Sequence, residues 1–139
     1  MNRNTTLPTD SAERKRIPLH AGLFKYFPAA LAGVALVSQE GNEKHNPGEP
    51  LHHARGKSMD HEECILRHLM DLQDHLAAYQ RQETYDVGPI LAEAGAIAWR
   101  ALALSQELHE RYGGAPLAPG ARVPTTWTQK ALSVSGTRS

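Results

Sequence analysis

The sequence predicts an all-α protein with a three-helix unit, which we expect oligomerisation to complete into a helical bundle. Two patterns predict this class. Apolar residues recur at intervals of three and four, and no alternating apolar pattern of useful length indicates a strand. At 139 residues the chain has the length of one domain, and its 40% hydrophobic and 6% aromatic residues predict a lean aliphatic core.

The chain divides into a helical part and two flanking segments. Residues 1–16 are polar and charged, which is typical of a flexible N-terminal arm. Residues 17–112 contain the helical domain. Residues 113–139 are rich in proline and glycine at their start, which predicts an extended C-terminal tail. Trp127 and Leu132 are candidates for attaching this tail to the core or to a partner.

The first predicted helix covers residues 28–39. Pro28 suits the first helical position, and Gly41 with Asn42 suits the end. The segment is apolar on nearly all faces, so we expect a central helix.

The second predicted helix covers residues 58–82. Ser58 or Asp60 suits its N-cap, and Glu63 lies three residues after Asp60, as in a capping box. An apolar stripe follows the helical period. Its members are Ile65, Leu69, Leu72 and Leu76.

The third predicted helix covers residues 89–112 and ends at Gly113 and Gly114. Small residues around Gly95 make it narrow, so another helix can approach closely. Its apolar stripe consists of Ile90, Ala94, Ile97, Ala101, Leu104 and Leu108. Because one of the three helices is so apolar, we expect a dimer or higher homo-oligomer.

The charge and cysteine content exclude several classes of protein. The net charge is zero, with 15 basic and 15 acidic residues, so no global field favours nucleic acid. The single cysteine, Cys64, excludes an internal disulfide and fits a reducing cytoplasm. The longest apolar stretch, Pro28 to Val37, is about half of the ~20 residues of a membrane span. We therefore expect a soluble, cytoplasmic protein without a membrane partner.

Carboxylates on the second helix predict a metal site. Glu62 lies close to the apolar stripe and Glu63 is adjacent to it. A carboxylate at the edge of a core is costly unless it is paired or binds a metal, and carboxylates suit Mg²⁺ or Mn²⁺. The alternative is an ordinary solvated face, with Arg67 paired to Glu63 or Asp71 at a spacing of four.

His61, His68 and His75 recur every seven residues on another face of the same helix. Seven residues span about 10 Å, so two of these histidines do not share one zinc ion. His68 is better interpreted as a hydrogen-bonding or phosphate-contacting group, with Asp71 as a candidate to orient it.

The segment GNEKHNPGEPLHHARGKS precedes the second helix and carries several cationic groups. It leads into a helix N-terminus, where free N–H groups favour an anion such as phosphate. It is not a P-loop, because the final GKS lacks the upstream glycine. A solvated linker is the alternative. The candidate substrate-binding residues are Lys44, His45, Asn46, His52, Arg55, Lys57 and Arg67.

Two stretches carry a resemblance to a known family. The run from Arg16 to Asp71, including YFPAALAGVA, GNEKHNPGEP and CILRHLMD, and the segment AWRALAL from Ala98 to Leu104 are its basis. They resemble the phage-type dATP/dGTP diphosphohydrolase N-terminal-domain family, which is grouped with the all-α, MazG-like nucleotide pyrophosphohydrolases. The resemblance covers about residues 16–110 and is most specific over 41–71.

The resemblance implies Mg²⁺- or Mn²⁺-dependent hydrolysis of purine deoxynucleoside triphosphates to the monophosphate and pyrophosphate. It implies that Glu62 and Glu63 match the paired glutamates of the metal helix. This chain has Leu66 and Ala96 where that family pattern has further acids. The candidate metal ligands are then Glu62, Glu63, Asp71 and Glu93, and the candidate catalytic residues are Glu63 and His68.

Two alternatives to an enzyme stay open. Because Leu66 and Ala96 leave the carboxylate set incomplete, the chain also fits a non-catalytic helical oligomer that binds or sequesters a nucleotide. The polar segments at both ends fit a structural assembly protein.

Overall fold

The computed structural model describes residues 4–54 and 60–122 and confirms the all-α class. Two short helical segments come first: α1 (Ser11–Lys15) and the π-helical turn η1 (His20–Phe24). Three long helices follow: α2 (Pro28–His45), α3 (His61–Gln80) and α4 (Gly88–Tyr112). Ser58, Arg55, Lys57, Trp127 and Leu132 lie outside the described residues.

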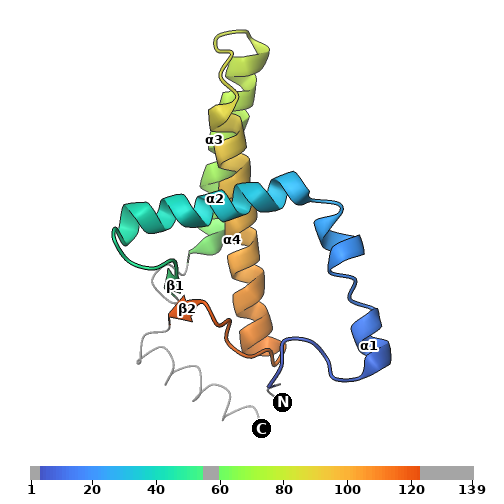
Figure 1. Ribbon diagram of the computed structural model, residues 1–139. Coiled ribbons are helices and arrows are strands. Elements are labelled where there is room, and N and C mark those ends of the chain that lie inside the picture. The colour runs from blue at the N-terminus through green and yellow to red at the C-terminus, as the bar shows by residue number, and fades with distance from the viewer. Residues whose placement is uncertain (1–3, 55–59, 123–139) are drawn as a thin grey trace.

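The helices α3 and α4 form an antiparallel hairpin, and α2 crosses the outside of α4 (Figure 1). The turn between α3 and α4 includes Gln82 in the left-handed region, at φ 61°. Asp86 accepts a 2.9 Å hydrogen bond from the N–H of Gly88, which satisfies one of the free donors at the start of α4.

The strands β1 (His53–Ala54) and β2 (Ala121–Arg122) are two residues each and pair in parallel. His53 lies opposite Ala121. This short pairing attaches the chain after α4 to the loop before α3 (Figure 1). It does not build a sheet that changes the fold class.

The crossing of α2 and α4 depends on a glycine. A Cβ at Gly95 would lie 3.1 Å from Val37 Cγ2 and 3.5 Å from the carbonyl oxygen of Gly33. The indole N–H of Trp99 donates a 2.7 Å hydrogen bond to Ser38 Oγ at the same crossing. The predicted close helix approach at Gly95 is therefore confirmed.

The structure corrects the end and the position predicted for the first helix. The helix continues through Gly41 and Asn42 to His45, because Asn42 is buried and donates its side-chain N–H to the carbonyl of Glu49 at 3.0 Å. It is also not central: α4 contacts both α2 and α3, and Leu36 of α2 is exposed. An all-round apolar composition does not say which neighbour covers each face.

The predicted capping box of the second helix is absent. Asp60 is the N-cap of α3, but its side chain makes no capping hydrogen bond. Its carboxylate instead accepts a 3.4 Å hydrogen bond from Arg67.

Only part of each predicted apolar stripe faces the interior. On α3, Leu69 and Leu76 are exposed, while His61 and Cys64 are buried. On α4 the stripe is split. Ile90, Ile97 and Leu104 are half-buried, whereas Ala94, Ala101 and Leu108 are exposed.

The segments flanking the helical domain contain local structure. Asp10 caps α1 by accepting a 3.0 Å hydrogen bond from the N–H of Glu13, within the predicted arm. After α4 the chain turns back at Gly114, which is buried and has φ 72°. Among the described residues no single helix is long and apolar enough to cross a membrane; one bent pair, Ser11–Phe24 with Pro28–His45, meets that test jointly.

Candidate functional site

The clearest cluster of metal-ligating side chains lies between α3 and α4. Ligand atoms of His68, Asp71 and Glu93 all lie within 4.8 Å of one another. His68 and Asp71 are three residues apart on α3 and therefore share a face, and Glu93 reaches them from α4. His68 and Glu93 are half-buried and Asp71 is exposed, so the cluster is open to solvent on one side.

Hydrogen bonding determines which nitrogen of His68 carries a proton in the neutral ring. His68 Nδ1 lies 2.7 Å from Glu93 Oε2. An ionised carboxylate only accepts hydrogen bonds, so Nδ1 donates, and Nε2 keeps its lone pair. Such a ring, oriented by a carboxylate, is suited to binding a metal or accepting a proton through Nε2.

The adjacent glutamates predicted from the sequence do not join this cluster. Glu62 and Glu63 are both exposed, so the expectation that Glu62 lies at the edge of the core is wrong. Glu62 and Asp71 are nine residues apart, which is two and a half helical turns, so they face opposite sides of α3. Of the four predicted metal ligands, the structure brings together Asp71 and Glu93, and adds His68.

The described part of the predicted phosphate-binding loop makes contacts within itself. Asn46 donates to Asn42 Oδ1 at 3.3 Å. His52 Nδ1 donates to the carbonyl of Pro50 at 3.0 Å, and its Nε2 lies 3.9 Å from Glu49. Lys44 and His45 are exposed in the last turn of α2, so they belong to a helix end rather than to a loop.

Arg67 is the predicted cationic residue closest in sequence to the cluster, one turn before Asp71. It forms an exposed ion pair with Asp60, and not the predicted pair with Glu63 or Asp71. The hydrogen bond from Arg67 to the Asp60 carboxylate raises the pKa of Arg67. Arg67 also donates to the Cys64 sulfur at 3.2 Å.

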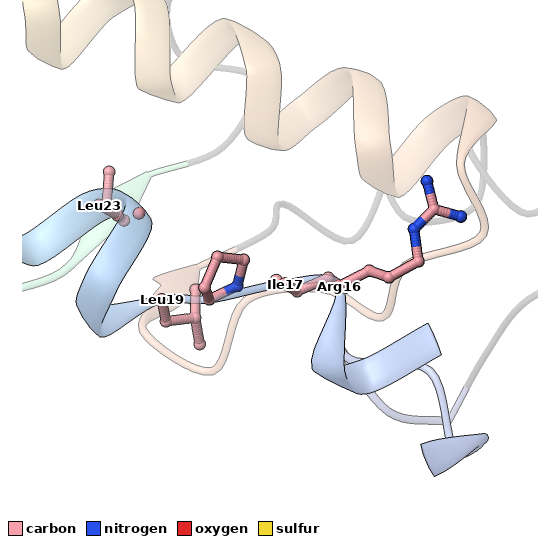
Figure 2. Close-up of a pocket in the computed structure, with 6 residues that line it drawn as sticks. Arg16, Ile17, Leu19 and Leu23 are labelled. Atoms are coloured by element: carbon pink, nitrogen blue, oxygen red, sulfur yellow. The ribbon is translucent and has the colours of Figure 1, made fainter. Parts of the chain in front are cut away.

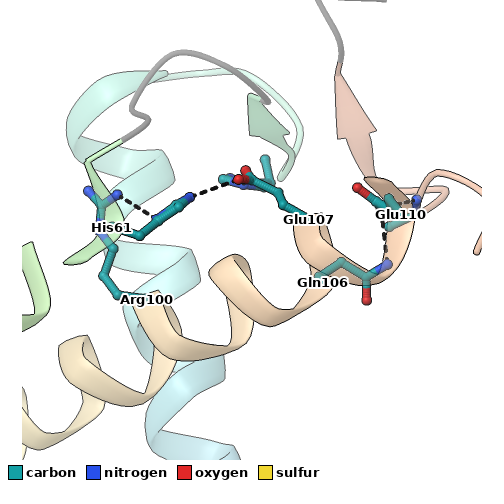
Figure 3. A network of polar contacts seen from close by, with 7 residues as sticks. His61, Arg100, Gln106, Glu107 and Glu110 are labelled. Atoms are coloured by element: carbon teal, nitrogen blue, oxygen red, sulfur yellow. Dashed lines mark hydrogen bonds and ion pairs between the residues drawn. The ribbon is translucent and has the colours of Figure 1, made fainter. Parts of the chain in front are cut away.

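A buried polar network, which sequence reasoning did not find, lies about two helical turns along α3 from the cluster (Figure 3). His61 is only 2% exposed. Its Nε2 lies 3.1 Å from Glu107 Oε2, and its Nδ1 lies 3.3 Å from Arg100 Nη1. A guanidinium has no acceptor, so Nδ1 accepts from Arg100 and Nε2–H donates to Glu107. The network fastens the start of α3 to α4.

Trp99 connects this network to the other elements. The ring of His53 from β1 meets it edge-on, with centroids 5.0 Å apart. The Arg100 guanidinium lies 5.6 Å from the Trp99 ring centroid, within the range of a cation–π contact. Because Trp99 also bonds Ser38, it links α2, α4 and β1.

One sequence signal accounts for both the cluster and the network. The histidines at 61, 68 and 75 repeat every seven residues, and Glu93, Arg100 and Glu107 repeat every seven residues on α4. In an antiparallel helix pair two such series meet along one seam. His68 accordingly meets Glu93, and His61 meets Arg100 and Glu107.

A shallow apolar hollow of about 270 Å³ lies at the N-terminal segment, away from these polar groups (Figure 2). Its lining is aliphatic apart from one arginine, so it offers no acid–base or metal-binding chemistry. The lining residues are Arg16, Ile17, Pro18, Leu19, Gly22 and Leu23.

The polar cluster at His68, Asp71 and Glu93 is thus the best-formed candidate site among residues 4–54 and 60–122. In comparisons with known proteins, no family model matches this chain, and neither a curated protein nor a solved structure is significantly similar to it.

Proposed function

We propose that the chain is a metal-dependent hydrolase that cleaves purine deoxynucleoside triphosphates to the monophosphate and pyrophosphate. The observation that carries this proposal is the convergence of His68, Asp71 and Glu93 within 4.8 Å between α3 and α4. The sequence resemblance over residues 16–110 supplies the substrate class and the reaction.

The three side chains fit a divalent cation. Two carboxylates offer the hard oxygen ligands that Mg²⁺ and Mn²⁺ prefer. His68 adds a nitrogen donor, which favours Mn²⁺ over Mg²⁺ because imidazole is a softer ligand. A few protein ligands are sufficient for such an ion, since Mg²⁺ keeps several waters and takes further oxygens from substrate phosphates.

Each residue of the cluster has a distinct role in the proposal. Asp71, Glu93 and His68 would hold the ion, which would supply a Lewis acid to polarise a phosphate and to lower the pKa of water. To share an ion with Glu93, His68 would bind it through Nδ1 and give up its hydrogen bond to Glu93, with the ring proton on Nε2. If His68 keeps that hydrogen bond, Nε2 is left to take a proton.

Among the described residues, Arg67 is the cationic group beside the cluster on α3, and it would neutralise substrate phosphates. Arg67 is exposed one turn before Asp71 on α3. Lys44 is exposed at the end of α2, and Arg55 and Lys57 belong to the segment outside the described residues. Arg67 would exchange its ion pair with Asp60 for a phosphate, a small cost because exposed pairs contribute about 0–1 kcal/mol.

The test is to mix pure protein with Mg²⁺ or Mn²⁺ and each deoxynucleoside triphosphate and to measure pyrophosphate. Glu93→Gln keeps the size of the side chain and removes the charge, so we expect turnover to fall at least 100-fold. Glu63→Gln is the matched control: it leaves turnover intact if the cluster is the site, and abolishes turnover if the paired glutamates are.

A non-catalytic nucleotide binder is the second candidate. It is favoured by the position of Glu62 and Glu63, which are exposed and remote from Asp71, so that the carboxylate set is small. Calorimetry that finds tight nucleotide binding without metal, with no pyrophosphate formed by folded protein, would select this function and exclude hydrolysis.

A further inference from the structure

One side of α4 is exposed along its length and carries no aspartate, glutamate, lysine or arginine; the exposed His109, five full turns after Leu91, lies at its edge. The positions 91, 94, 98, 101, 105, 108 and 112 step by three and four and so follow one face of the helix. All of these residues are exposed except the half-buried Ala98. This neutral stripe consists of Leu91, Ala94, Ala98, Ala101, Ser105, Leu108 and Tyr112, with the exposed Leu102 beside it.

The charged residues of α4 lie on the opposite half of the helix. Arg100 follows Leu91 by nine residues, and Glu107 follows Ala98 by nine, which is two and a half turns in each case. The charges of Arg100 and Glu107 face the interior, where both residues contact His61, whereas Arg111 near the end of α4 is exposed. A surface helix of a monomeric protein has the reverse arrangement, with its charges toward water.

The helix α3 adds exposed leucines beside the same hairpin. Leu69 and Leu76 are 40% and 38% exposed and follow the half-buried Ile65 and Leu72 by four residues on α3. About 20 residues of each helix span about 30 Å, and two adjacent helices are about 20 Å wide. The face therefore offers about 600 Å² per copy, or about 1,200 Å² in a dimer, which reaches the size of a specific interface.

A single copy buries very little apolar surface. Among the described residues the buried apolar side chains are Cys64, Ala103 and Ala115, and none of them is large. Ordering the backbone costs roughly 1–2 kcal/mol per residue, which burial of larger side chains has to offset. Exposed leucines of the α3–α4 hairpin are part of the apolar surface that could still be buried; a second group, which includes Phe24 and Phe27, lies on the N-terminal segment.

We propose that the neutral stripe of α4, flanked by Leu69 and Leu76 of α3, is a homodimer interface, where α4 packs against α4 of a second copy and the two α3 helices border the contact. The occupant is a second copy because an uncharged face is complementary to itself: a two-fold axis brings the same patch onto both sides without burying an unpaired charge. Ala94, Ala98 and Ala101 at the centre allow the two helices to approach closely. Dimerisation through this stripe is independent of the proposed hydrolysis.

The first experiment measures mass by sedimentation equilibrium. We expect the wild type to have twice the chain mass of 15.3 kDa. Ala101→Glu places an unpaired carboxylate from each copy in the interface and should weaken dimerisation at least 100-fold. Ala92→Glu, nine residues away on the other half of α4, is the matched control and should remain dimeric.

Two results overturn the proposal: a wild type that is monomeric at 100 µM chain, chosen as about the highest convenient concentration, or an Ala101→Glu variant that dimerises as well as Ala92→Glu. Cysteine cross-linking guards against a variant that only misfolds. We expect oxidation to give a covalent dimer for Ala94→Cys, Ala101→Cys or Ser105→Cys, but not for Ala92→Cys or the wild type. Cross-linking at none of the three stripe positions places the interface elsewhere.

Discussion

Replacing Gly95 by alanine tests the crossing of α2 over α4, the contact that positions the first long helix. The added methyl group would lie 3.1 Å from Val37 Cγ2, closer than carbon atoms normally pack. Overpacking of this kind costs about 1–3 kcal/mol. Alanine also gains about 1 kcal/mol over glycine in a helix interior, so the net change in stability is expected to be small or destabilising.

Gly41→Ala separates these two effects. Gly41 lies within α2, and a Cβ there meets nothing within 4 Å. This variant should benefit from the higher helix propensity of alanine without any steric cost, and should be stabilised by about 0.5–1 kcal/mol. The difference in stability between the two variants then gives the cost of the contact between the added methyl group and Val37, which we expect to be about 1–3 kcal/mol.

Urea denaturation of both variants measures this difference in the free energy of unfolding. In thermal unfolding, the melting temperature of Gly95→Ala should lie below that of Gly41→Ala by roughly 4 °C for each kcal/mol of the difference. Equal stabilisation by the two substitutions would refute the reasoning, because it would mean that Gly95 does not face Val37. A larger side chain extends the test: Gly95→Leu should separate α2 from α4 and remove the Trp99–Ser38 hydrogen bond.

Three further predictions concern the polar contacts and the end of α4. His61→Ala removes the buried donor to Glu107 and should destabilise the fold by about 2–3 kcal/mol in urea denaturation; a loss below about 0.5 kcal/mol, the range of ordinary surface substitutions, would contradict the network. Arg81 lowers the pKa of Glu83 by hydrogen bonding. This ion pair therefore stabilises the fold above the ordinary glutamate pKa and loses its effect as pH falls through the lowered pKa; in a carboxyl NMR titration Arg81→Ala should return Glu83 to its ordinary range. Gly114 has φ 72°, so Gly114→Ala should cost about 1–2 kcal/mol in thermal unfolding, and an unchanged melting temperature would exclude this turn.

The sequence determined the helices because their signals are local. Pro28 and Gly113 mark a start and an end, and the three- and four-residue spacing of apolar residues marks the bodies of α3 and α4. The end of α2 could not be predicted, because Gly41 and Asn42 usually stop a helix. The helix continues because Asn42 is buried and bonds the Glu49 carbonyl, a contact that exists only once the loop has folded back.

The site was partly determined by the sequence. The carboxylate and histidine content of the second helix indicated where candidate ligands lie, and Asp71, Glu93 and His68 are among the candidates. Which of them converge depends on which face of α3 meets α4. The glutamates at 62 and 63 lie on faces of α3 that the neighbouring helix does not reach, so they remain exposed.

Only the tertiary structure decided which face of α3 meets α4. By sequence alone, the apolar stripe of α3 was the best candidate for the buried face, yet the face that meets α4 carries His61 and His68 against Arg100, Glu107 and Glu93. Hydrogen bonds between the two heptad series compensate for burying polar groups. Local periodicity determines that a helix has an apolar face, whereas the choice of what that face contacts depends on partners distant in sequence, and for the neutral stripe of α4 we propose that this partner is a second copy.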